Sequence, residues 1–182
     1  MNARPAQPGD AAALAGIVRR AITEGAASVY REDQIAQWAG SFSTSRLRRV
    51  VASTSTFVVE EEGVAGFATL VVGEAGRGEL DLLYVDPDRW DRGVARCAVE
   101  AVEAEARHRG LAWLWADASL LAVPVLEHLG YVVQRRYDKA RGSVTFPNTW
   151  LVKELGRSRP SGVGRTVVGG RLTGDGEEGL PR

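Results

Sequence analysis

The segment "GELDLLYVDPDRWDRGVARCAVEAVEAEARHRGLAWLWAD", residues 78–117, constrains the fold more than any other part of the chain. It begins with an apolar run of strand length that stops at Asp86-Pro87. From Val94, apolar residues recur at helical spacing on one stripe, and a second apolar strand follows Gly110. Because a strand, a crossover helix and another strand pack together with one handedness, the two strands are expected to lie parallel in one sheet.

The remaining segments predict helices near the start and antiparallel strands elsewhere. Helices are expected from an Asp10 cap to Gly25, over 31–39, over 44–53 with Thr44 or Ser45 as cap, and over 120–130. Strands are expected within 3–10, on both sides of a Glu62-Gly63 turn in 56–72, and over 131–137 and 144–155. The fold class is therefore mixed α/β (α+β), with a mostly antiparallel sheet, a central parallel strand pair and flanking helices.

Composition limits the organisation and the partners of the chain. With 182 residues, 45% of them hydrophobic, one domain over 1–155 is expected, followed by a disordered Gly/Arg-rich tail over 156–182. Zero net charge argues against nucleic acid, and no apolar run could span a membrane, so a cytoplasmic protein is expected. The single Cys97 excludes an internal disulfide, and His108 and His128 lack ligand spacing, so no metal is expected.

The junction between the strand ending at Val85 and the helix starting near Gly93 predicts an anion site. Unpaired N–H groups and the positive end of the helix dipole converge there, and a phosphate or diphosphate suits such a site. Gly93 and Ala95 leave room for close approach to the backbone, while Arg92 and Arg96 add positive charge. Taken alone, the motif more often marks only an ordinary helix start.

Several segments in order resemble the GNAT acetyltransferase superfamily over residues 3–155. "YVDPDRWDRGVA" resembles its phosphate-binding signature, with Gly93 and Ala95 in the small-residue positions and Trp90 where Gln or Arg is usual. "ADASLLAVPVLEHLGYVV" is similar to the segment that completes the coenzyme cleft. "YREDQIAQWA" and "RGSVTFPNTWLVKEL" are similar to segments of a bacterial subgroup.

The resemblance implies acetyl-CoA as cosubstrate, no metal, and direct acetyl transfer to an amine of a small molecule or protein. It implies backbone contacts from one strand to the pantetheine, a diphosphate loop, and a hydroxyl near the thiol. The strand residues that would contact the pantetheine are Leu83, Tyr84 and Val85. The diphosphate loop would consist of Asp91, Arg92, Gly93, Val94, Ala95 and Arg96. The hydroxyl would be that of Ser119, near the pantetheine or its thiol end.

Glu79 and Asp81 are the candidate bases. They lie at i and i+2 on one face of the strand, where two carboxylates can raise a pKa. By resemblance, Glu79 aligns with the catalytic glutamate of the histone-acetylating branch, and Asp81 with an acid of the bacterial subgroup. Glu79 is the first candidate. The alternative is that one or both are solvated, or bind a cationic substrate without proton transfer.

The general acid of many relatives, a helix tyrosine, is replaced here by Val125 and Leu126. Tyr30 could substitute, although packing against Trp38 is the simpler interpretation. Solvent protonation is another alternative, and lost activity would make the protein a non-catalytic acyl-CoA-binding or regulatory domain.

Further residues have open roles at this point. Asp117 could touch the substrate. The tail could mediate protein interaction, and a homodimer is possible. Several arginines could guide an acidic acceptor, although a solvated surface is the simpler interpretation: Arg135, Arg136, Arg141 and Arg157.

Overall fold

The computed structural model describes residues 1–73 and 76–156, so the predicted tail lies outside the described residues from position 157 onward. The strands are β1 (Asn2–Pro5), β2 (Ser55–Glu60), β3 (Val64–Val72), β4 (Gly78–Val85), β5 (Trp113–Ser119), β6 (Val132–Arg141) and β7 (Val144–Glu154). The α-helices are α1 (Ala11–Arg20), α2 (Glu32–Gly40), α3 (Thr44–Ser53), α4 (Val94–His108) and α5 (Ala122–His128). Shorter helical segments are η1 (Pro8–Asp10), η2 (Ala21–Gly25) and η4 (Pro87–Arg89).

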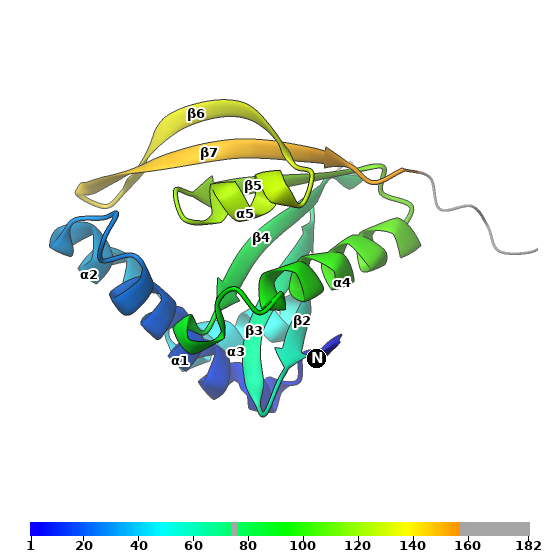
Figure 1. Ribbon diagram of the computed structural model, residues 1–182, viewed down its shortest axis with the longest axis horizontal. Helices are drawn as coiled ribbons and strands as arrows, with labels where there is room; N and C mark the ends of the chain where they lie inside the picture. Colours follow the sequence, from blue (N-terminus) through cyan, green and yellow to red (C-terminus); the bar gives the residue numbers. More distant parts are fainter. Residues whose placement is uncertain (74–75, 157–182) are drawn as a thin grey trace, which may run out of the picture.

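The strands form one mixed sheet in the order β1-β2-β3-β4-β5-β7-β6 (Figure 1). Strands β4 and β5 pair in parallel, and every other neighbouring pair is antiparallel. The crossover through α4 joins the parallel pair, which confirms the topology expected from residues 78–117. The predicted fold class is therefore correct.

Helices cover both faces of the sheet. Helix α4 packs an apolar stripe, including Ala98 and Val102, against one face, and α5 lies beside β5 on that same side. Helices α1 and α3 pack Leu14 and Leu47 against the other face. Helix α2 contacts the hairpin of β6 and β7 through a separate small cluster. The sheet is thus enclosed on both faces around its β4–β5 junction.

The parallel strands separate soon after they meet. Only Gly78–Leu80 of β4 pairs with β5, through Leu114–Ala116, and Figure 1 shows β4 diverging steeply from β5 beyond this point. Beyond the bulge at Asp81, residues 82–85 of β4 keep their pairing with β3 but present their other edge to the gap. Unpaired strand edges carry free N–H and C=O groups, so this part of β4 can bind an extended ligand.

A β-bulge in β4 changes which side chains face each side. Thr69 pairs with Leu82 and Leu70 with Leu80, so Asp81 is the extra residue. As a result Leu80 and Leu83 both pack on the α4 side, although the two positions are three apart.

The predicted helix caps need correction at two positions. Ser43, rather than Thr44 or Ser45, caps α3, because its Oγ accepts a hydrogen bond from the Arg46 N–H at 3.2 Å. Asp10 does not cap α1 with its side chain. Its carboxylate instead accepts from the N–H of Gln7 and from the guanidinium of Arg4. No helix among the described residues has the length and apolar character needed to cross a membrane.

Candidate functional site

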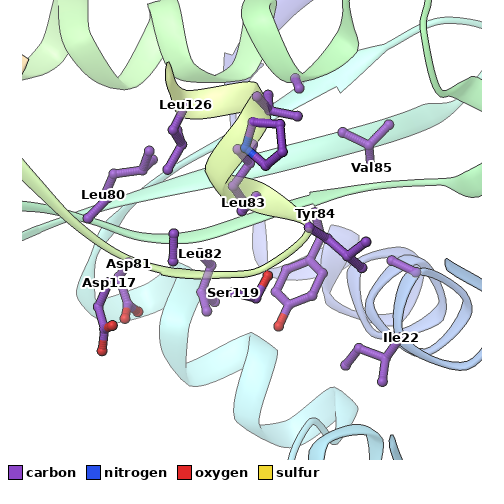
Figure 2. Close-up of a pocket in the computed structure, with 18 of the residues that line it drawn as sticks. Ile22, Leu80, Asp81, Leu82, Leu83, Tyr84, Val85, Asp117, Ser119 and Leu126 are labelled. Atoms are coloured by element: carbon purple, nitrogen blue, oxygen red, sulfur yellow. The ribbon is translucent and has the colours of Figure 1, made fainter. Parts of the chain in front are cut away.

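A pocket of about 700 Å³ opens where β4 and β5 separate (Figure 2). It has a Gly93 end at the start of α4 and a carboxylate end, which we define by Glu79, Asp81 and Asp117. The predicted site residues that line it are Tyr30, Glu79, Asp81, Leu83, Tyr84, Val85, Asp91, Gly93, Val94, Ala95, Arg96 and Ser119. Residues from four separate stretches of the chain thus meet in one cavity.

Gly93 adopts a left-handed backbone conformation, with φ of 82°, and begins α4 as its N-cap. This conformation costs an ordinary L-residue roughly 1–2 kcal/mol, which accounts for glycine at this position. No atom lies within 4 Å of where a Cβ would stand, so the space beside the first helical N–H groups is open. The Gly93 end can therefore accept an anion close to the backbone.

The arginines around Gly93 differ in their placement. Arg96 lines the pocket, with its Nη2 3.1 Å from Nε2 of His128. Arg92 does not line this pocket, and its Nη1 lies 3.8 Å from Glu61 instead. Positive charge thus reaches the Gly93 end from Arg96, while Arg92 faces a neighbouring surface.

Trp90, which departs from the family signature, contacts the segment before α2. Its indole Nε1 donates to the Val85 carbonyl at 3.2 Å. Its ring also lies where a side chain of Gly25 would be, because a Cβ there would stand 2.5 Å from Cη2 and 2.6 Å from Cζ2. Gly25 ends the π-helical segment η2 as the sequence predicted, and the structure adds a steric reason for glycine at this position.

We expect Gly25→Ala to displace the Trp90 ring and disturb the loop that precedes Gly93. Because the ring is 44% exposed, it can swing outward, so the loss of stability should be below about 1 kcal/mol. The affinity for acetyl-CoA, the cosubstrate that the family resemblance implies, should fall several-fold when measured by calorimetry. Gly16→Ala is the matched control, since its Cβ meets no atom within 4 Å. An unchanged affinity in Gly25→Ala would show that Trp90 does not position the loop.

Glu79 and Asp81 both have raised pKa values at the carboxylate end. Burial raises the pKa of Glu79, and the charges of Asp81 and Asp117 raise it further. Burial within the pocket also raises the pKa of Asp81, although its side chain reaches solvent. Figure 2 shows the Asp81 and Asp117 carboxyl groups side by side. The predicted pair therefore shares one site, and each member is easier to protonate than an ordinary carboxyl group.

Asp117 accepts hydrogen bonds from a polar network that sequence analysis did not identify. Its donors are Tyr137 at 2.8 Å, Lys139 and, at 2.9 Å, Asn148. Burial alone would raise the pKa of Asp117, but these three hydrogen bonds bring it below the usual value. Asp117 is therefore ionised at neutral pH. The predicted strand ended at Tyr137 and did not include Lys139, and the network depends on the register of β6 with β7.

We expect Lys139→Met to raise the pKa of Asp117, because it removes one hydrogen bond and one positive charge. The same charge lowers the pKa values of Glu79 and Asp81, so these should rise as well. Carboxyl carbon NMR titration measures the shifts. The other lysine of the chain provides the control: Lys153 pairs with Glu103, so Lys153→Met should leave the three values unchanged. Equal titration curves in wild type and Lys139→Met would contradict the network.

Tyr30 is buried, and its hydroxyl accepts a hydrogen bond from the Leu120 N–H at 2.9 Å. Burial raises the pKa of Tyr30, so the hydroxyl keeps its proton at neutral pH. The ring packs edge-on against Trp38, with centroids 5.5 Å apart, as the simpler interpretation predicted. This packing does not exclude a role for the hydroxyl, which lies in the pocket lining with Ser119.

The other candidate residues have ordinary surroundings. Cys97 lies on the apolar stripe of α4 and packs beside the core. Trp115 packs edge-on against Trp150, whereas Trp113 is 48% exposed. Within residues 1–73 and 76–156, no group of three or more His, Cys, Asp or Glu side chains is placed to hold a metal.

Comparison with known proteins identifies the family. The model of the acetyltransferase (GNAT) family matches residues 22–131. The chain is 32% identical over 141 residues to the "uncharacterized N-acetyltransferase YafP" of Escherichia coli K12, covering 75% of this chain and 85% of that protein.

Two solved structures share the fold. A GCN5-related N-acetyltransferase from Rhodopseudomonas palustris has a TM-score of 0.76 and 30% identity, covering 84% of this chain and 94% of that one. The PaiA N-acetyltransferase of Thermoplasma acidophilum, solved in complex with coenzyme A, has a TM-score of 0.70 and 16% identity, covering 84% and 98%. With its sheet, its pocket and these matches in agreement, the chain belongs to the GNAT acetyltransferase family.

Proposed function

We propose that the protein transfers an acetyl group from acetyl-CoA to an amine by direct attack, without a covalent enzyme intermediate. The observation that carries this proposal is the single pocket that joins an open strand edge, an anion site and two carboxylates with raised pKa values. Acetyl-CoA carries a diphosphate, an extended pantetheine and a reactive thioester in that order, which suit the Gly93 turn, the free edge of β4 and the carboxylates, respectively.

The residues around the cleft fit the proposed cosubstrate. The free edge of β4 at Leu83, Tyr84 and Val85 offers N–H and C=O groups to the amides of the pantetheine, as an added strand would. The open turn at Gly93, with Val94, Ala95 and Arg96, offers N–H groups and positive charge to the diphosphate. A strand N–H beside the Asp81 bulge is suited to polarise the thioester carbonyl.

Glu79 is the proposed base, with Asp81 as the second candidate. An ammonium acceptor loses two protons as it becomes an amide, of which one ends on the coenzyme A thiol and the other leaves through the base. A carboxylate with a raised pKa accepts a proton near neutral pH better than an ordinary one does. The half-buried position of Glu79 at the carboxylate end supports this role.

Tyr30 is the proposed proton donor to the departing thiolate. Its oxygen already accepts from the Leu120 N–H, so its own proton is free to point into the pocket. Helix α5 carries Val125 and Leu126 where many relatives carry the acid, and neither side chain can donate a proton. The lack of a proton donor at these two positions also supports the second candidate function, a non-catalytic acyl-CoA-binding domain.

Release of free thiol separates the two functions. Purified protein, acetyl-CoA and a panel of small amines and amine-bearing peptides are expected to release thiol with at least one acceptor, at a rate well above spontaneous hydrolysis. Calorimetric binding of acetyl-CoA without thiol release on any acceptor would favour the binding domain. Tyr30→Phe should lower kcat with little change in the affinity for acetyl-CoA.

A further inference from the structure

The carboxylate end of the pocket carries charges of both signs in equal number. Its lining includes the carboxylates Glu79, Asp81 and Asp117, together with the cations Arg46, Lys139 and Arg141. The cations come from α3 and β6, which are far from β4 in sequence. All three lower the pKa of Asp81, which places them around the same carboxylate. The formal charges of these six side chains sum to zero, but an acceptor bound here faces both acidic and basic groups.

Two of these cations make no direct ion pair with an acidic side chain among the residues that the structure describes, although their charges act on Asp81. Lys139 pairs with Asp117, whereas Arg46 and Arg141 take part in no ion pair within 1–73 and 76–156. By contrast, the arginines of the pocket outside this end are paired: Arg89 with Glu61 at 3.4 Å and Arg96 with Glu100 at 3.8 Å. Within the described lining, the arginines that make no ion pair are those at the carboxylate end.

Aromatic rings hold the two guanidinium groups in position. Arg46 lies over the Phe42 ring at 4.6 Å, and its Nη1 donates to the Ser41 carbonyl at 2.7 Å. Arg141 lies over the Phe146 ring at 5.7 Å. A cation over a ring is attracted to it but keeps its N–H groups at the edge for other partners. Contacts with aromatic rings thus position both guanidinium groups, and neither group makes a direct ion pair with a described carboxylate.

The same rings form a continuous aromatic belt between the arginines, which we define as Phe42, Tyr84, Trp38 and Phe146. Successive ring centroids along the belt are 5.6, 6.5 and 6.1 Å apart. All four residues line the pocket. The belt therefore forms an apolar wall along the pocket, and its two end rings, Phe42 and Phe146, lie beneath the two guanidinium groups.

The carboxylates, guanidinium groups and aromatic belt at this end of the pocket together discriminate between classes of amine acceptor. A polyamine would bring its second positive charge toward Arg46 or Arg141, and like charges in one pocket repel. An amine without an acid group would leave both guanidinium groups without a partner. A zwitterion satisfies both signs, because guanidinium groups bind carboxylates through two parallel hydrogen bonds.

We propose that the acceptor is a free α-amino acid with an apolar side chain. The proposal rests on the acetyl transfer proposed above. The α-ammonium group lies against Glu79 and Asp81, the α-carboxylate binds Arg46 and Arg141, and the side chain packs on the aromatic belt. Acetylation removes the positive charge of the acceptor and therefore its attraction to Glu79 and Asp81, which favours release of the product.

The experiment compares amino acids with the amines that they yield on losing the carboxylate. Thiol release is measured with leucine against 3-methylbutylamine, phenylalanine against phenethylamine, and spermidine. The wild-type protein should have a kcat/KM at least about 10-fold higher for the amino acid of each pair, since one charged hydrogen-bonded contact contributes about that factor. Spermidine should be the poorest acceptor.

Arg46→Gln and Arg141→Gln test the carboxylate site directly. Each should lower kcat/KM for the amino acid by about 10- to 100-fold while changing the decarboxylated amine less than about 3-fold. The KM for acetyl-CoA should stay constant. Arg48→Gln is the matched control, because Arg48 lies on the same helix, is exposed and does not line the pocket.

The outcomes separate this inference from the proposed function. Wild-type preference for the decarboxylated amine or spermidine, or an equal loss for both members of a pair in Arg46→Gln and Arg141→Gln, would overturn the amino-acid site. If no amine is acetylated, the proposed transfer fails, and calorimetry with leucine and 3-methylbutylamine, with and without coenzyme A, tests the site alone. Heat from leucine that Arg141→Gln abolishes would support the site, and its absence in wild type would overturn it.

Discussion

Glutamate in place of Gly93 is expected to weaken acetyl-CoA binding by at least about 100-fold. The new side chain would extend from a left-handed turn into the space beside the first N–H groups of α4, where the diphosphate is proposed to bind. Two like charges about 4 Å apart near a protein surface repel by about 4 kcal/mol, which exceeds a 100-fold change in affinity. Isothermal calorimetry of acetyl-CoA with wild type and Gly93→Glu measures the difference.

Gly63 provides the matched control for this variant. It also has a positive φ, 106°, with no atom within 4 Å of an added Cβ, but it lies in the β2–β3 hairpin turn. Gly63→Glu therefore introduces the same charge, also at a positive φ, far from the proposed diphosphate. Equal affinities for acetyl-CoA in wild type and Gly93→Glu would show that the diphosphate does not bind at the Gly93 turn. Equal losses in Gly93→Glu and Gly63→Glu would assign the effect to strain or charge in general.

Removal of the base is expected to lower kcat/KM by about 100- to 10,000-fold. Glu79→Gln should have this effect if Glu79 takes the proton, and Asp81→Asn should then have a smaller effect through the loss of ammonium binding. Steady-state thiol release measures both. Glu127→Gln on α5 is the control, because Glu127 is exposed and does not line the pocket. Changes below about 3-fold in both Glu79→Gln and Asp81→Asn would exclude carboxylate base catalysis.

The same two substitutions are expected to stabilise the fold at neutral pH. Because the pKa of each carboxyl is raised in the folded state, the folded protein binds more protons than the unfolded chain above the unfolded pKa. Stability is therefore lost as the pH rises from the unfolded pKa through the folded pKa, and it stays lower above both. A neutral side chain avoids this loss, so thermal midpoints of Glu79→Gln and Asp81→Asn at pH 7 should exceed that of wild type. Lower midpoints would contradict the raised pKa values.

Local sequence signals predicted most of the framework. The strand that ends at Asp86-Pro87 and the helical stripe from Val94 were sufficient for the parallel pair, because chain connectivity restricts how such units pack. The turn at Gly93 was identified for the same reason, since the chemistry of a helix N-terminus is contained in a few consecutive residues. Glu79 and Asp81 were placed on one face of a strand, and the structure brings them to the same pocket.

The features that were missed depend on contacts between distant segments. "LDLL" at 80–83 reads as a simple alternation, and the bulge at Asp81 exists only in the register of β4 with β3. Arg46 and Lys139 were not candidates, because the pairing of β6 with β7 and the packing of α3 bring them to Asp81. The sequence identified Trp90 only as a departure from the family signature, because its contact with Gly25 joins two segments that are far apart in the chain.

The central claim is that amide hydrogens at the Gly93 turn bind the diphosphate of coenzyme A. Calorimetric titration of the wild-type protein with acetyl-CoA and with acetyl-pantetheine tests it most directly, because the second compound keeps the thioester and the strand-binding amides but lacks the diphosphate. We predict saturable binding of acetyl-CoA and at least about 100-fold weaker binding of acetyl-pantetheine. Equal affinities for the two compounds, or no heat with millimolar acetyl-CoA, would contradict the claim.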